Sequence, residues 1–145
     1  MRKLSDAAAF SLVEVTLAIG IAAFCLITVC ALVPVAVLAN RNATSQTAAT
    51  NIIASVTADM RATTASTSPQ YNITFGTPKT LFFDGAGQFT TSLGANSRYR
   101  VSVTFPSSPS GLSYADIKAT WPAPADPATT TPSGSAEMFT AFKRN

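Results

Sequence analysis

Glu14 is the residue in this sequence whose type and position most clearly call for a chemical partner. It is the only acid or base in the apolar stretch from Phe10 to Ala39. A charged side chain at the centre of a membrane-length segment costs about 2.5 to 3.5 kcal/mol on insertion scales, so by default it is interpreted as functional. We therefore expect Glu14 to meet a positive charge.

The nearest source of that charge is an amino terminus created by cleavage. Only nine residues precede the apolar stretch, and they include two basic residues and one acid. A cut between Ala9 and Phe10 would give Phe10 a free amine and make Glu14 the fifth residue of the mature chain. Unit charges about 4 Å apart attract by roughly 4 kcal/mol at an effective dielectric near 20, before desolvation is subtracted. Such a pair would offset the cost of a lone carboxylate.

This arrangement resembles the class III signal of type IV prepilins and pseudopilins. The shared features are a short basic leader, a small residue before the cut, an aromatic first residue and a glutamate at mature position five. Ala9 stands where the family usually has glycine. The order AFSLVEVTLAIGIAAFCL is also similar to the Verru_Chthon cassette protein B family, a group of short pilin-like proteins of Verrucomicrobia. The resemblance covers about residues 1–40.

The resemblance implies a minor pilin or pseudopilin, a subunit of a type IV pilus or of a type II secretion-like filament. In that family a prepilin peptidase removes the leader and methylates the new amine, here the amine of Phe10. Glu14 would then pair with the amine of a neighbouring pilin or pseudopilin subunit and set the axial register. The implied partners are this peptidase, other subunits, an assembly platform in the inner membrane and the lipid bilayer.

Other interpretations of the same residues stay open. An acid in the first turns of a helix gains about 0.3 to 1 kcal/mol from the helix dipole, so Glu14 could be merely interfacial. The chain could be a single-pass membrane-anchored binding module, or a secreted domain released by signal peptidase after Ala39. A secretory signal, however, has an apolar core of about 7 to 15 residues, roughly half the present length. A lipoprotein signal would need a small residue before Cys25 or Cys30, and both follow bulky residues.

The apolar stretch is long enough to cross a membrane. Thirty helical residues span about 45 Å, against a hydrocarbon core of about 30 Å. The basic leader predicts a cytoplasmic amino terminus, with everything after Arg41 outside. We therefore expect a leader at residues 1–9, a transmembrane and assembly half of a helix at 10–39, and a periplasmic head. The mature protein would leave the inner membrane for a periplasmic or cell-surface filament.

Catalytic chemistry is hard to place elsewhere. The chain has no histidine, the commonest general base and metal ligand, and its net charge is only +3. The acids after Phe10 are all at least ten residues apart, and no glycine-rich phosphate loop is present. Cys25 and Cys30 would lie about 140° apart around a helix, which favours small apolar packing residues. We expect no enzymatic activity, no cofactor, no metal site and no nucleic-acid partner.

The helix is predicted to resume after Pro34 and to become amphipathic over residues 40–62. Apolar residues recur there at helical spacing, while polar residues, Thr57 and Asp59 among them, occupy the other positions. The alternative is a weak, threonine-rich helix that frays. The apolar positions are Ala48, Ala49, Ile52, Ile53, Val56 and Met60.

Residues 63–145 are predicted to form a small β-rich head, which makes the fold class α+β with a pilin-like plan. Alternation predicts a strand over 71–75, and Asp84-Gly85-Ala86-Gly87 predicts a hairpin turn rather than a calcium loop. The clearest strands, 98–105 and 115–121, should form the centre of the sheet.

Two further features of the head can be predicted. Arg98 and Arg100 should lie on a solvated strand face, whereas Trp121 should anchor the core before Pro122 ends its strand. Residues 122–136 contain four prolines and predict an extended, mobile loop. A last short strand carrying Met138, Phe139 and Phe142 should follow this loop.

Overall fold

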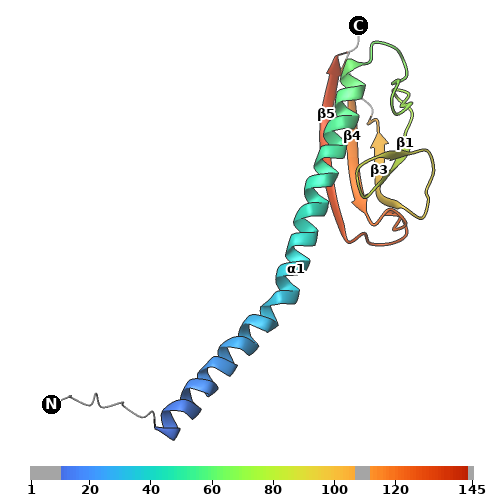
Figure 1. Ribbon diagram of the computed structural model, residues 1–145. Helices are drawn as coiled ribbons and strands as arrows, with labels where there is room; N and C mark the ends of the chain where they lie inside the picture. The colour runs from blue at the N-terminus through green and yellow to red at the C-terminus, as the bar shows by residue number, and fades with distance from the viewer. Residues whose placement is uncertain (1–10, 107–111, 144–145) are drawn as a thin grey trace, which may run out of the picture. The chain divides into compact units, whose positions relative to one another are not determined.

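A computed structural model describes residues 11–106 and 112–143. One long helix precedes five strands. Figure 1 shows the course of the chain through the helix and the sheet. The chain divides into two compact units, Met1–Asn40 and Arg41–Asn145. The elements are α1 (Leu12–Ala62), β1 (Lys79–Asp84), β2 (Phe89–Thr90), β3 (Ser97–Thr104), β4 (Leu112–Trp121) and β5 (Gly134–Lys143).

The first part of α1 is apolar on all sides. Its large side chains from Leu12 to Leu38 are all exposed. Pro34 lies inside the helix without ending it, as predicted. The hydroxyl of Thr28 donates to the carbonyl oxygens of Phe24 and Cys25, at 2.9 and 2.8 Å, so this polar group is satisfied within the helix itself. Polar groups in a membrane-spanning helix have to be satisfied in this way.

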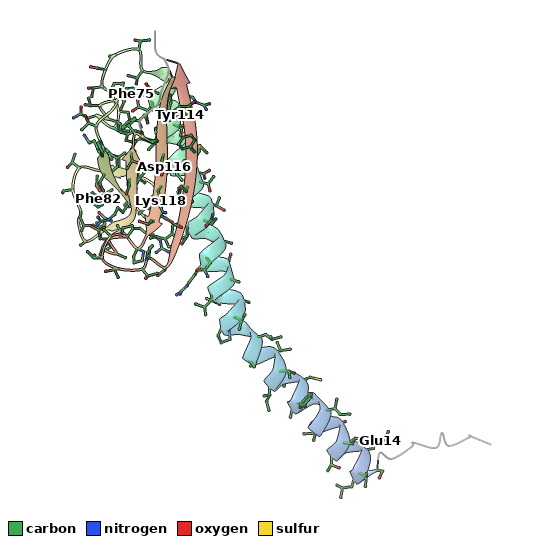
Figure 2. The ribbon with its side chains drawn as sticks, turned by 180° about the vertical axis from the view of Figure 1, so that it is seen from behind. Glu14, Phe75, Phe82, Tyr114, Asp116 and Lys118 are labelled. Carbon is green, nitrogen blue, oxygen red and sulfur yellow. The ribbon has the colours of Figure 1, made fainter. Side chains whose placement is uncertain are left out.

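The second part of α1 is one-sided and covers the sheet. The predicted apolar stripe is confirmed, since Ala49, Ile52, Ile53, Val56 and Met60 are buried and Ala48 packs beside them. In Figure 1 the helix passes in front of the sheet, and in the reversed view of Figure 2 the sheet lies in front of the helix. The predicted end of the helix near Ala62 is also confirmed.

Two residues predicted for the polar side of this helix are in fact buried. The Thr57 hydroxyl points to the sulfur of Met138, 3.7 Å away. One carboxylate oxygen of Asp59 accepts a hydrogen bond of 3.3 Å from the Tyr71 amide. The sequence prediction was wrong here because periodicity does not reveal polar partners on other elements, and such partners make burial tolerable.

The five strands form one antiparallel sheet in the order β2-β1-β3-β4-β5. The long strands β3 and β4 pair with Val103 opposite Ile117 and Val101 opposite Ala119, so their apolar residues share the face under α1. This confirms that the 98–105 segment is central and that the 115–121 segment lies beside it. The fold is thus α+β, a long N-terminal helix packed on an antiparallel sheet, with a pilin-like architecture.

Trp121 is a core residue, as predicted. It is 7% exposed, and its ring lies 6.1 Å from that of Tyr99, edge to face. Strand β4 ends at Trp121, directly before Pro122. Gly134 lies so close that a Cβ atom there would overlap the Trp121 indole. The absence of a side chain at Gly134 is therefore what lets β5 pass the indole.

The segment 71–75 alternates buried and exposed residues but is not a strand, so that prediction was wrong in its secondary structure. Tyr71 and Ile73 are buried as expected. Asn72 between them has a φ of 52°, a left-handed conformation that interrupts an extended backbone. Ser68 holds Ile73 by two hydrogen bonds. The Ser68 amide donates to the Ile73 carbonyl at 2.9 Å, and the Ile73 amide donates to the Ser68 hydroxyl at 3.1 Å. Hydrogen bonds within the loop thus take the place of those to a neighbouring strand.

The hairpin turn after β1 is confirmed. Oδ1 of Asp84 accepts hydrogen bonds from the amides of Ala86 and Gln88, at 2.9 and 2.8 Å. Gly87 has a φ of 80°, which favours glycine. Asp84 thus accepts hydrogen bonds within the turn itself, as a hairpin turn requires.

The proline-rich segment differs from its prediction. Strand β5 begins at Gly134, so residues 134–136 belong to a strand of 10 residues rather than to the loop, and the last strand is not short. The remainder is a series of turns fixed to β3. The Ala123 amide donates to the Arg98 carbonyl at 2.9 Å, and Asp126 forms an ion pair of 2.9 Å with Arg100. The turns are held by these polar contacts in a segment with few apolar groups.

Candidate functional site

Glu14 lies in the first turn of α1 and is exposed. The carbonyl of Ser11 accepts hydrogen bonds from the amides of Glu14 and Val15, at 3.0 and 3.1 Å, which places Ser11 at the N-cap. A serine at the N-cap with glutamate three residues later is the capping-box pattern, and the helix dipole also favours an acid there. Glu14 is therefore positioned by the start of the helix, with its side chain accessible to a second molecule.

The predicted cleavage site lies outside the described residues. Ala9 and Phe10 both fall in that part of the chain, so cleavage and methylation stay predictions. What the structure gives is the position of Glu14, four residues after Phe10, in the first helical turn.

The helix that carries Glu14 is suited to an apolar environment. Within the described residues it is the one helix long and apolar enough to cross a membrane, and its most apolar part is not buried. Cys25 and Cys30 are free thiols exposed on this part of the helix. The large apolar side chains on every side of this segment leave it without a protein core of its own.

A second surface with notable chemistry is the outer face of the sheet, the face away from α1. There the Arg100 guanidinium lies over the Phe82 ring, 5.4 Å from its centroid. The same guanidinium donates to Asp126 at 2.9 Å and to the Ala123 carbonyl at 3.0 Å. Arg100 is thus held between an aromatic ring and a carboxylate, and is not simply solvated as predicted.

Arg98 is exposed, as predicted, but it also makes a contact that the sequence did not predict. The pairing of β1 with β3 shifts register at this point, since Phe83 pairs with Tyr99 but Asp84 pairs with Ser97. Arg98 lies at this irregularity, and its guanidinium donates to the Ser45 hydroxyl of α1 at 3.1 Å. The alternation of buried and exposed residues still holds through this shift, so Arg98 is exposed and in addition bonds the helix.

At the other end of the outer face, aromatic and charged residues gather over β4 and β5. The rings of Tyr114 and Phe139 are stacked, with centroids 5.4 Å apart and planes 18° apart. Phe139 is nevertheless 62% exposed. Figure 2 shows Tyr114, Asp116 and Lys118 following one another along β4. Phe139 pairs with Asp116 in the strand register, which places the exposed ring beside the carboxylate.

Asp116 is the least satisfied polar residue of this surface. Its Oδ1 is shielded from solvent and has no hydrogen-bond partner among the described residues. Burial, and then the charge of Glu137, raise the pKa of the Asp116 carboxyl, while Lys118 acts in the opposite direction. Lys118 forms its ion pair with Glu137, at 3.0 Å. Asp116 and Glu137 also share a side-chain hydrogen bond, which raises the Asp116 pKa further.

Sequence separation concealed this cluster. Asp116 and Glu137 are far apart along the chain, and only the antiparallel register of β4 and β5 brings them together. The outward positions of both strands could be inferred from alternation, but the register could not. Even so, the described residues contain no group of three or more metal-ligating side chains that could hold an ion.

Comparisons with known proteins found no matching family model, no similar curated protein and no similar solved structure.

Proposed function

We propose that this chain is a minor pilin or pseudopilin, a structural subunit of a type IV pilus or of a type II secretion-like filament, and not an enzyme. The observation that carries this proposal is that the two parts of α1 differ in which of their side chains are buried. From Leu12 to Leu38 the helix exposes apolar side chains on every side, and from Ser45 to Met60 it buries one face against an antiparallel sheet. One element thus joins a lipid-compatible segment to a folded head.

The proposed route begins in the inner membrane, with the amino terminus cytoplasmic and the head periplasmic. A prepilin peptidase cuts between Ala9 and Phe10 and methylates the new amine. At the assembly platform, Glu14 then pairs with the Phe10 amine of a neighbouring subunit. The accessible position of Glu14 in the first turn supports this step, because its carboxylate is only a few residues from the new terminus.

Intact mass of the protein isolated from its own host tests the proposal. A mature pilin starts at methylated Phe10. A membrane-anchored binding module would start at Met1, and a domain released by signal peptidase would start at Asn40; finding either of these ends the pilin hypothesis. Ala9→Gly is a matched control, since it installs the residue usual in the family and should leave the same mature mass.

A further inference from the structure

Two segments of the sequence match the acceptor pattern for N-linked glycans, asparagine followed two residues later by serine or threonine. They are Asn42-Ala43-Thr44 and Asn72-Ile73-Thr74, and neither has a proline in the middle. The pattern requires an asparagine amide, which receives the sugar, and a hydroxyl two residues later. Such triplets also arise by chance, so the surroundings of each one have to decide between them.

The first triplet lies within α1, where its two groups are poorly placed for one enzyme. Successive side chains of an α-helix are about 100° apart around the axis, so residues two apart point about 200° apart. The Asn42 amide and the Thr44 hydroxyl therefore project from nearly opposite sides of the helix. The helix continues to Ala62, so this segment cannot change its backbone without breaking a long element.

The second triplet lies in the loop between α1 and β1, which Figure 1 shows as an irregular trace after the end of the helix. Asn72 and Thr74 are both exposed, whereas Tyr71 and Ile73 are buried. The amide and the hydroxyl of the pattern thus reach solvent together from one short loop. Glycan acceptors are expected in surface loops of this kind.

The contacts of this loop leave the Asn72 side chain unused. Among the described residues, Asn72 is hydrogen-bonded through its backbone carbonyl alone, which accepts from Nζ of Lys79 at 2.6 Å. The neighbouring Tyr71 and Ile73 are held through their own backbone groups, by Asp59 and Ser68. A sugar on Nδ2 of Asn72 would therefore leave every one of these hydrogen bonds in place.

We propose that Asn72 is the acceptor of an N-linked oligosaccharide. Nδ2 of Asn72 forms a bond to the anomeric carbon of the first sugar and loses a proton to a base of the transferring enzyme. The bond between that carbon and the pyrophosphate of a lipid carrier breaks, so the donor is a lipid pyrophosphate-linked oligosaccharide. The reaction requires that the head lie outside the cytoplasm. The pilin proposal and both of its alternatives share this location, so the inference goes beyond that proposal and does not depend on it.

Tryptic mapping of the protein isolated from its own host tests the assignment. Cleavage after Arg61 and Lys79 gives a peptide of residues 62–79, which contains Asn72. We expect this peptide to carry the added mass of an oligosaccharide, located on Asn72 by electron-transfer fragmentation. Cleavage after Arg41 and Arg61 gives the matched control, a peptide of residues 42–61 that contains the helical triplet. This control should have its unmodified mass.

Three variants of the full chain separate the acceptor from its surroundings. Asn72→Asp keeps a residue type that tolerates a φ of 52° but has no amide nitrogen, so the added mass should be lost. Thr74→Ser keeps the hydroxyl and should retain the added mass, whereas Thr74→Val should lose it. Unfolding followed by Trp121 fluorescence checks that each variant is folded.

The proposal would be overturned by an unmodified 62–79 peptide in the natural chain, by an added mass that persists in Asn72→Asp or Thr74→Val, or by an oligosaccharide on Asn42. The amino-terminal peptide of the same digest decides the pilin proposal separately, because it starts at methylated Phe10 or it does not.

Discussion

Replacing Ile53 by alanine tests whether the second part of α1 belongs to the core of the head. Ile53 is 2% exposed and lies in the cluster that includes the inner-face residues of β3 and β4. Truncation of a buried isoleucine to alanine costs about 2 to 5 kcal/mol, from lost transfer free energy and from the cavity left behind. Because Ile53 is almost fully enclosed, we expect Ile53→Ala to lower the free energy of unfolding by an amount within this range.

The expected change is large enough for a simple assay. One kcal/mol shifts the Tm of a domain of about 100 residues by roughly 4 to 8 °C, so Ile53→Ala should lower the Tm by at least about 8 °C. The only tryptophan, Trp121, is buried in the head, so its fluorescence reports unfolding of the head alone. The measurement uses the full chain in detergent micelles, where the apolar part of the helix is solvated.

Ile27→Ala is the matched control. It is the same substitution in the same helix, with the same gain in helix propensity, but Ile27 is 69% exposed. Its Tm should stay within about 2 °C of the natural chain, because no cavity forms in the head. Equal shifts in the two variants, or an unchanged Tm in Ile53→Ala, would refute the conclusion that α1 completes the core.

Three further expectations concern single residues. Glu14→Gln should leave membrane insertion and leader removal intact. It should reduce the amount of this protein in sheared filaments by more than about tenfold, measured by quantitative mass spectrometry. Normal incorporation would show that Glu14 is merely interfacial. Burial and a neighbouring carboxylate raise the pKa of Asp116, so the folded state binds its proton more tightly and loses stability as pH rises through that range. Asp116→Asn should therefore raise the Tm at pH 7, with an advantage that disappears below about pH 4, and an unchanged advantage at acid pH would contradict this assignment. Gly134→Ala should destabilise the head because the new Cβ would overlap Trp121, whereas Gly94→Ala, at a site with open space, should be nearly neutral in thermal unfolding.

The features predicted well from sequence depend on neighbouring residues. The stripe from Ala49 to Met60 and the alternation around Val101 and Ile117 reflect periods of 3.6 and 2, which contiguous residues display by themselves. The turn at Asp84 is equally local, because its hydrogen bonds close within four residues. These elements could be placed before any tertiary contact was known.

The failures occurred where a distant residue decides the outcome. Residues 71–75 alternate like a strand, but the left-handed Asn72 and the bonds to Ser68 replace a neighbouring strand. Arg100 was predicted to be solvated, but the Phe82 ring and the distant Asp126 enclose its guanidinium. Of the candidate site, the position of Glu14 in the first turn followed from sequence, whereas the surface around Asp116 required the register of β5.

The apolar part of α1 requires an environment that the described residues of this chain do not provide. Burying apolar surface stabilises by about 25 cal/mol per Å², and its exposure to water costs the same amount, so a segment exposed on every side from Leu12 to Leu38 is not stable in water. In the proposed function, lipid would relieve this cost before assembly, and packing against the helices of other subunits would relieve it afterwards. Apolar packing alone has little directional preference, however, and would allow neighbouring helices to slide. In the proposed filament, a single carboxylate at Glu14 would fix their axial positions, because only one register would bring it to a charged partner.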